Sequence, residues 1–250
     1  MAAPATEAVQ GTCGSQVNPR KIARVSLLGH ALAVAAKDLK VEARSREIVY
    51  TMAFFAAMVV LLFSFAFKDS TDDPSVVISG LVWISVIFAG TLGLSRAFDR
   101  ERENDTMRGL LLSPIPRTAI FLGKSVSIAV FMLIVQAVVL PMAALLFAVD
   151  VFANPAELMG LLALATIGVS TVGSTFAAML LRTRARDVLL PVVLYPILVP
   201  LFMAATFGTM AILPPEFDLQ TAHFWIKFLV VYDALFVAAS LWIFESLVIE

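Results

Sequence analysis

The chain has 250 residues, of which 60% are apolar, and its mean hydropathy of +0.92 excludes an ordinary soluble domain. Its single cysteine, Cys13, excludes an internal disulfide framework. The formal net charge is −1, and the basic residues flank apolar stretches among acidic ones. That arrangement suits lipid headgroups better than nucleic acid, so no nucleic-acid partner is expected.

Residues 1–23 are polar and small and contain no apolar core, so they predict a disordered tail and not a signal peptide. Residues 24–48 then follow a helical period. One face carries apolar residues and the opposite face carries basic ones, namely Leu28, Leu32, Ala35, Leu39 and Ala43 against Lys37, Lys40 and Arg44. This pattern is typical of an amphipathic helix in the membrane interface. A solvated helix ahead of the first span is the alternative.

Six apolar stretches follow, and each is long enough to cross a hydrocarbon core about 30 Å thick. They lie at about residues 49–67, 76–94, 118–149, 158–181, 188–213 and 224–245. The fifth contains Pro191, Pro196 and Pro200, which predict kinks or unwound turns. A bent helix beside a pathway and a static kink fit these prolines equally well. Residues 24–250 are therefore expected to form one all-α polytopic membrane domain.

The positive charges are distributed unequally across these spans. If the N-terminus is cytoplasmic, sixteen of the eighteen Lys and Arg residues lie inside, and only Lys68 and Lys227 lie outside. The positive-inside rule therefore predicts a multi-pass protein of the cytoplasmic (inner) membrane with both termini in the cytoplasm.

The inner connection, residues 95–117, is the longest inner loop and the densest in charge. Residues 96–103 alternate in charge and favour a helix, and residues 106–112 carry a short apolar stripe that Pro114 and Pro116 end. We expect two short helices here and a docking role for a cytoplasmic partner. A merely solvated connection is the alternative.

No catalytic or metal-binding motif is visible, so neither a catalytic residue nor a resident metal is expected. Residues 123–125, Gly-Lys-Ser, resemble the end of a phosphate-binding loop, but Thr118 stands where the first glycine is required. We therefore interpret the match as accidental and expect no ATP hydrolysis by this chain. The two histidines, His30 and His223, cannot form a multi-histidine site within one chain. His223 is a candidate haem ligand, although a lone interfacial histidine is more often unliganded.

Asp233 lies within the last apolar stretch, residues 224–245, about a third of the way across it. A carboxylate at such a depth costs about 2.5–3.5 kcal/mol on insertion scales and normally faces protein or water. Asp233 is therefore predicted to face a polar seam or dimer cavity and not lipid. Its role is either a hydrogen bond to a neighbouring helix or a conformational switch.

Three stretches resemble the CcmB family, the membrane subunit of the haem-exporter-type ABC system of c-type cytochrome maturation. They are KDLKVEARSRE at 37–47, RAFDRERE with DTMRGLLLSPIP at 96–116, and RDVLLP at 186–191 with Tyr195, Pro196 and Pro200. The second stretch is the most specific, and together the three cover residues 31–200. The family often has glycine where this chain has Asp105, which bears on the geometry of the inner turn.

The resemblance implies a six-span, ABC-2 or exporter-type permease that dimerises with a second copy of itself. It also implies two copies of a separate ATP-binding subunit, so the chain itself is not expected to be an enzyme. That subunit would dock on the inner loop, at Phe98, Asp99, Glu101, Glu103 and Thr106.

Haem-handling membrane proteins that load a haem chaperone are further implied partners. No tightly bound cofactor is expected, and haem enters only as a transported or handled ligand. Two other functions stay open. One is a permease of similar architecture for a lipid or drug. The other is a non-transporting scaffold that couples ATP hydrolysis to release of a haem chaperone.

Overall fold

The computed structural model describes residues 27–67, 74–103, 116–180, 183, 185–214 and 217–246. Within these residues the chain forms seven helices and no strand. They are α1 (Leu27–Ser45), α2 (Glu47–Ala66), α3 (Pro74–Glu103), α5 (Arg117–Phe147), α6 (Pro155–Met179), α7 (Arg186–Ile212) and α8 (Leu219–Ser246). All except α1 are long and apolar enough to cross a membrane. The expected all-α polytopic fold with six spans is therefore confirmed.

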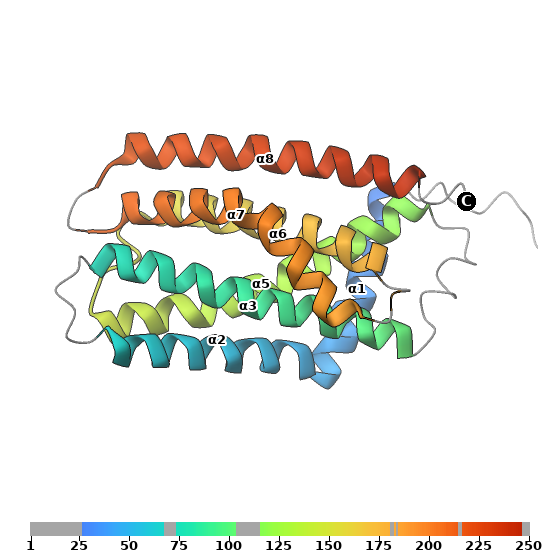
Figure 1. Ribbon diagram of the computed structural model, residues 1–250, viewed down its shortest axis with the longest axis horizontal. Helices are drawn as coiled ribbons and strands as arrows, with labels where there is room; N and C mark the ends of the chain where they lie inside the picture. Colours follow the sequence, from blue (N-terminus) through green and yellow to red (C-terminus); the bar gives the residue numbers. More distant parts are fainter. Residues whose placement is uncertain are drawn as a thin grey trace, which may run out of the picture.

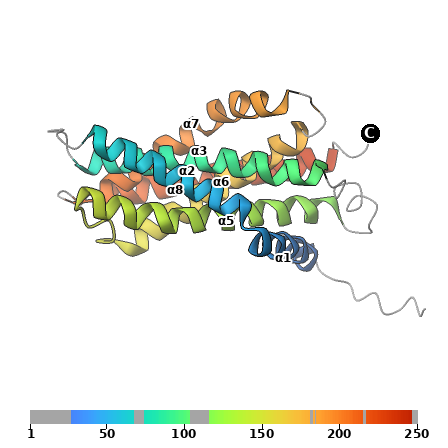
Figure 2. The same ribbon diagram turned by 90° about the horizontal axis from the view of Figure 1, so that it is seen from below.

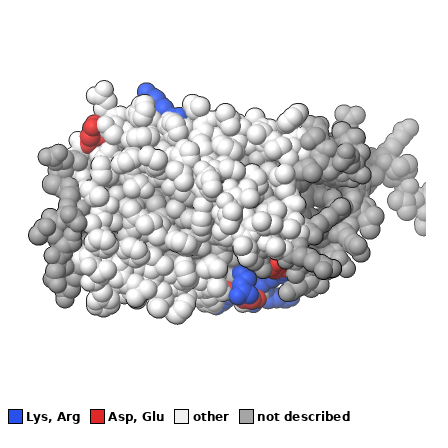
Figure 3. Space-filling view, viewed as in Figure 1, with Lys and Arg blue, Asp and Glu red and all other residues white. Residues whose placement is uncertain are grey.

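The six long helices run side by side along the long axis of the molecule, and α1 lies across one end of the bundle (Figures 1 and 2). We call that end, where α3 also finishes, the α1 end. In the face drawn in Figure 3, charged side chains lie only near the two ends, and the surface between them is uncharged. A broad uncharged belt is what a bundle surrounded by lipid requires.

Helix α6 is the most buried of the spans, whereas α2 and α8 are among the least buried. Small residues in α6 let its neighbours approach closely. A Cβ atom built on Gly168 would lie 2.6 Å from Oδ1 of Asp233 in α8 and would also collide with Leu201 of α7. A larger residue at position 168 would therefore force the side chains of Leu201 and Asp233 to shift, and glycine permits this three-helix contact.

Hydrogen bonds between side chains also join the helices inside the bundle. Trp83 Nε1 donates to Thr209 Oγ1 at 2.9 Å, and Gln136 Nε2 donates to Thr166 Oγ1 at 3.0 Å. Thr175 Oγ1 donates to Ser240 Oγ at 2.7 Å. Such bonds average about 0.6 kcal/mol in membrane proteins, so they set the register of the helices more than they set total stability.

The chain turns sharply between α1 and α2 at Arg46, which has a φ of 57° in the left-handed region. This turn lets α1 lie across the bundle while α2 runs along it (Figure 1). The predicted helix of residues 24–48 thus begins at Leu27 within the described residues and breaks at Arg46.

The packed face of α1 coincides with its predicted apolar stripe only at Ala35 among the buried residues. Ala31, Val34 and Ala35 are buried, but Leu28 and Leu32 are 68% and 63% exposed. The helix therefore packs its Ala31–Ala35 side against α5, and the stripe that begins at Leu28 lies largely beside this contact. Helix α1 therefore carries two adjacent apolar faces, one packed against α5 and one exposed.

The predicted inner loop is partly helical. Residues 95–103 continue α3 without a break, so the segment 96–103 is an extension of a spanning helix and not a separate short helix. Residues 104–115 lie outside the described residues, as does the predicted tail 1–23.

Candidate functional site

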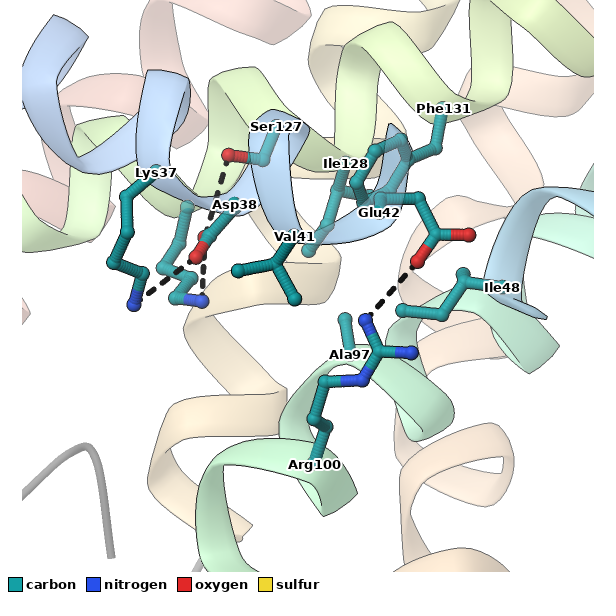
Figure 4. Close-up of a pocket in the computed structure, with 11 residues that line it drawn as sticks. Lys37, Asp38, Val41, Glu42, Ile48, Ala97, Arg100, Ser127, Ile128 and Phe131 are labelled. Atoms are coloured by element: carbon teal, nitrogen blue, oxygen red, sulfur yellow. Dashed lines mark hydrogen bonds and ion pairs between the residues drawn. The ribbon is translucent and has the colours of Figure 1, made fainter. Parts of the chain in front are cut away.

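Charged side chains of α1 and α5 meet at the α1 end of the bundle (Figure 4). The Nζ atom of Lys124 lies 2.6 Å from Oδ2 of Asp38, and the side chains of these two residues are only 7% and 13% exposed. Lys37 Nζ lies 3.1 Å from Oδ1 of Asp38, and Ser127 Oγ donates to Oδ2 at 3.4 Å. Asp38 thus carries a nearly buried ion pair that joins α1 to α5.

One turn further along α1, Glu42 joins three helices. Its Oε2 atom lies 3.1 Å from Nη1 of Arg100 in α3, and its Oε1 atom accepts a hydrogen bond from the backbone N–H of Val49 in α2 at 2.9 Å. The Glu42 side chain is 4% exposed. Arg100 also contacts Ser45 and Glu47, at 3.0 and 3.3 Å. Glu42 therefore links α1, the first turn of α2 and the last turns of α3.

We call Asp38, Glu42, Arg100 and Lys124 the charged junction. These residues surround a cleft of about 240 Å³ whose other lining residues are mostly apolar, including Val41, Ile48, Ile128 and Phe131. Removing one member of a buried ion pair generally costs about 3–5 kcal/mol, because the remaining charge is left without compensation. The charged junction therefore holds α1 at one position and angle on the spans.

The local sequence explains why the junction forms. Asp38 and Glu42 are four residues apart, so both carboxylates project from the same side of α1. Gly123, beside Lys124, allows α1 to approach α5 closely, since a Cβ atom there would lie 2.7 Å from the carbonyl oxygen of Ala31. Gly123 thus has a packing role and Lys124 a pairing role in the structure.

Sequence reasoning did not identify these residues as a site. The available signals were the i, i+4 pair of acids on an otherwise basic helix and a lysine inside an apolar span. Neither signal indicates which residue the charged side chain will contact, because the pairing depends on how the helices are rotated against one another.

The predicted docking residues have different surroundings in the structure. Phe98 is 1% exposed and packs in the core, so its side chain is not on the surface of the chain. Asp99 is partly exposed and already takes part in an interaction within the chain. Glu101 and Glu103 belong to the last turn of α3, but their side chains lie outside what the structure describes, as does Thr106 entirely. Of the two docking residues whose side chains the structure describes, Phe98 departs from a surface role, because it occupies the inward face of α3.

Asp233 is 6% exposed and lies where α6, α7 and α8 meet, next to Gly168. Both carboxyl oxygens are buried, and neither has a hydrogen-bond partner among the described residues. The hydrogen bond to a neighbouring helix, one of the two predicted roles, is therefore not found in this part of the chain. Because α8 begins at Leu219, Asp233 is fourteen residues, or about 21 Å, along the helix, near its middle.

The histidines are far apart in the fold. His30 is partly buried in α1, and His223 is exposed near the start of α8, at the other end of the bundle (Figure 1). Among the residues that the structure describes, no group of three or more His, Cys, Asp or Glu side chains is placed to hold a metal ion.

Comparison with known proteins gives two matches. The model of a family described as CcmB protein matches residues 29–244, which include nearly all of the seven helices. Heme exporter protein B of Pseudomonas aeruginosa is 27% identical over 160 residues, which make up 64% of this chain and 71% of that protein.

Proposed function

Because the chain belongs to the CcmB family, we propose that it is the membrane permease subunit of an ABC transporter complex for haem export or haem-chaperone loading in c-type cytochrome biogenesis. The family match over residues 29–244 carries this proposal, and the name of the Pseudomonas relative supports the haem assignment. The six apolar helices supply the membrane-embedded part that such a subunit needs.

The proposed location is the cytoplasmic (inner) membrane, with the α1 end and both termini facing the cytoplasm. Among the described residues, Arg100 and Lys124 of the charged junction and the neighbouring Lys37 lie at the α1 end, while Lys227 lies near the start of α8 at the opposite end. This difference follows the positive-inside rule. The exposed Leu28 and Leu32 of α1 would then face the inner leaflet, with the exposed Lys40 and Arg44 turned toward headgroups and water.

The proposed partners are two copies of an ATP-binding subunit, a second copy of this chain, and haem-handling membrane proteins with their chaperone. The ATP-binding subunit supplies the hydrolysis, so this chain acts as a transporter component. The charged junction supports a mechanical role, since Glu42 and Arg100 connect α1 to α3, and α3 leads directly into the predicted docking loop. Movement of that loop would pass through Arg100 to α1 and the first turn of α2.

A deletion strain complemented with variants tests the proposal. We expect loss of covalently bound haem in c-type cytochromes, with b-type cytochromes retained, and restoration by the wild-type gene. Glu42→Gln should restore the cytochromes poorly, whereas Lys227→Gln, a change at an exposed residue at the opposite end of the bundle, should restore them fully. Normal c-type cytochromes in the deletion strain would refute a haem-related function and favour a permease for a lipid or drug.

A second experiment separates transport from scaffolding. Proteoliposomes that contain the full complex are loaded with haem and supplied with ATP. Two quantities are then measured separately: the haem that appears in the external medium and the chaperone that is released from the complex. Haem transfer that needs this chain supports export. Release of the chaperone without haem transfer supports the scaffold.

A further inference from the structure

Helix α7 divides into two halves that pack differently. Its second half, residues 200–212, runs within the bundle, whereas its first half, residues 186–199, leaves the common direction and stands out from the other helices (Figures 1 and 2). Burial follows the same division. The first half buries a narrow stripe at Leu190, Leu194 and Leu198 and exposes Val188 and Val192 by 68% and 63%.

The prolines explain where the helix bends. Proline has no backbone N–H, so Pro196 cannot donate to the carbonyl of Val192, and Pro200 cannot donate to the carbonyl of Pro196. Two successive turns of α7 therefore each lack one backbone hydrogen bond. Sharp bends in helices are found at such positions.

A side chain of α8 binds α7 inside this weakened stretch. The hydroxyl of Tyr232 donates a hydrogen bond of 2.8 Å to the carbonyl oxygen of Ile197, which lies between the two prolines. Tyr232 is only 9% exposed, and its ring centroid lies 4.4 Å from that of Phe236 on the same helix. The hydroxyl therefore comes from a well-packed side chain and holds one defined point of α7.

The second half of α7 is held more firmly. Trp83 of α3 donates to Thr209, and the side chain of Asn154 donates to the carbonyl oxygen of Ile212 at 3.1 Å. Phe207 stacks on Trp225 of α8 with ring centroids 5.5 Å apart. These contacts come from α3, from the residue before α6, and from α8, so they fix the second half from three sides.

We propose that α7 is a hinged helix whose first half moves about residues 196–200, with the Tyr232–Ile197 hydrogen bond as the pivot and the second half as the fixed base. The proposal concerns this chain alone and does not depend on what the complex transports. It assigns Tyr232 a positioning role, in which the hydroxyl keeps the angle of the bend defined.

Spin-label distances in the full-length chain, purified into lipid nanodiscs, test the hinge. Cys13→Ser removes the native thiol, and labels are placed at the exposed residues Val188 and Ile134 in one protein and at Met203 and Ile134 in another. Val188 is nine residues from Ile197, or about 14 Å along the helix. A change of about 20° in the bend therefore moves the label at position 188 by about 5 Å.

Tyr232→Phe keeps the ring and removes the hydroxyl. We expect it to broaden the 188–134 distance distribution and to leave the 203–134 distribution unchanged. Replacing Pro196 and Pro200 together by alanine restores both missing donors, and it should shift the 188–134 distance by several ångströms, again without affecting position 203.

Unchanged 188–134 distributions in both variants would overturn the proposal, as would equal changes at positions 188 and 203. If Tyr232→Phe fails to yield folded protein, the proline variant alone decides. An unshifted 188–134 distance in that variant refutes the hinge.

Discussion

The ion pair between Lys124 and Asp38 should make a large contribution to the stability of the fold. We consider Lys124→Met, which keeps the apolar stem of the side chain and removes its charge. At 2.6 Å and an effective dielectric constant of about 20, the two charges attract by about 6 kcal/mol before desolvation is subtracted. Lys124→Met leaves Asp38 nearly buried beside Lys37 alone, so we expect a loss of about 3–5 kcal/mol in the free energy of unfolding.

Lys37→Met is the matched control, because Lys37 also contacts Asp38 but its side chain is 40% exposed. An exposed ion pair contributes about 0–1 kcal/mol, so this variant should change stability little. The double variant Asp38→Leu with Lys124→Met removes both charges and should recover much of the loss, as apolar replacements of buried ion pairs generally do.

The assay is equilibrium unfolding of the purified protein in mixed micelles, followed by circular dichroism. Asp38→Leu alone is measured as well, and all five proteins, the wild type included, are compared at one pH and salt concentration. The reasoning would be refuted if Lys124→Met cost no more than Lys37→Met. It would also be refuted if the double variant were as unstable as the sum of the two single changes, since independent sites add.

Four further predictions concern three other sites of the chain. Asp233→Leu should leave thermal stability unchanged or raise it, because it replaces an unpartnered buried carboxyl with an apolar side chain of similar shape; a lower Tm would mean that a donor holds the carboxyl. If the charge serves a conformational switch, Asp233→Asn should assemble normally yet fail to support c-type cytochrome formation in the complementation assay. Asp218 precedes α8 and accepts hydrogen bonds from Thr221. The bond from the Thr221 hydroxyl, and then the bond from its backbone N–H, lower the pKa of Asp218 below its usual range. The stabilisation from this cap is therefore full above about pH 4 and is lost as the pH falls through the lowered pKa. Amides of the first turn should then lose protection against exchange, relative to their intrinsic exchange rate at each pH, in the acidified wild type but not in Asp218→Asn. Reversing the charges of Glu101 and Glu103 together should prevent co-purification of the ATP-binding subunit, and intact co-purification with normal ATP hydrolysis would remove these residues from the docking role.

The sequence alone determined the fold class, and the reason is the solvent. A hydrocarbon layer requires every backbone polar group to be paired within the protein, so long apolar stretches can only be helices in a chain of this kind. Six such stretches and the unequal placement of Lys and Arg were therefore enough for the number of spans. The family resemblance rested equally on the sequence, since the motifs at 37–47 and 96–116 are local.

Tertiary structure decided which side chains meet. Asp38 and Ser127 are 89 residues apart in the chain, and Glu42 and Arg100 are 58 apart, yet both pairs lie in contact. A helical period shows which residues share a face of one helix, but not how that helix is rotated or shifted against its neighbours. For the same reason Phe98, predicted at the docking surface, lies in the core.

The bend in α7 was likewise settled by packing. Helix α8 begins at Leu219, five residues before the apolar stretch as read from hydropathy, so Asp233 lies near the middle of this helix. The prolines of α7 predicted a bend whether the helix lies beside a pathway or is statically kinked. Only the packed bundle showed that one half is anchored and that Tyr232 binds the carbonyl of Ile197, between Pro196 and Pro200. Hydropathy records the free energy of transfer into lipid residue by residue, whereas these features depend on contacts between helices.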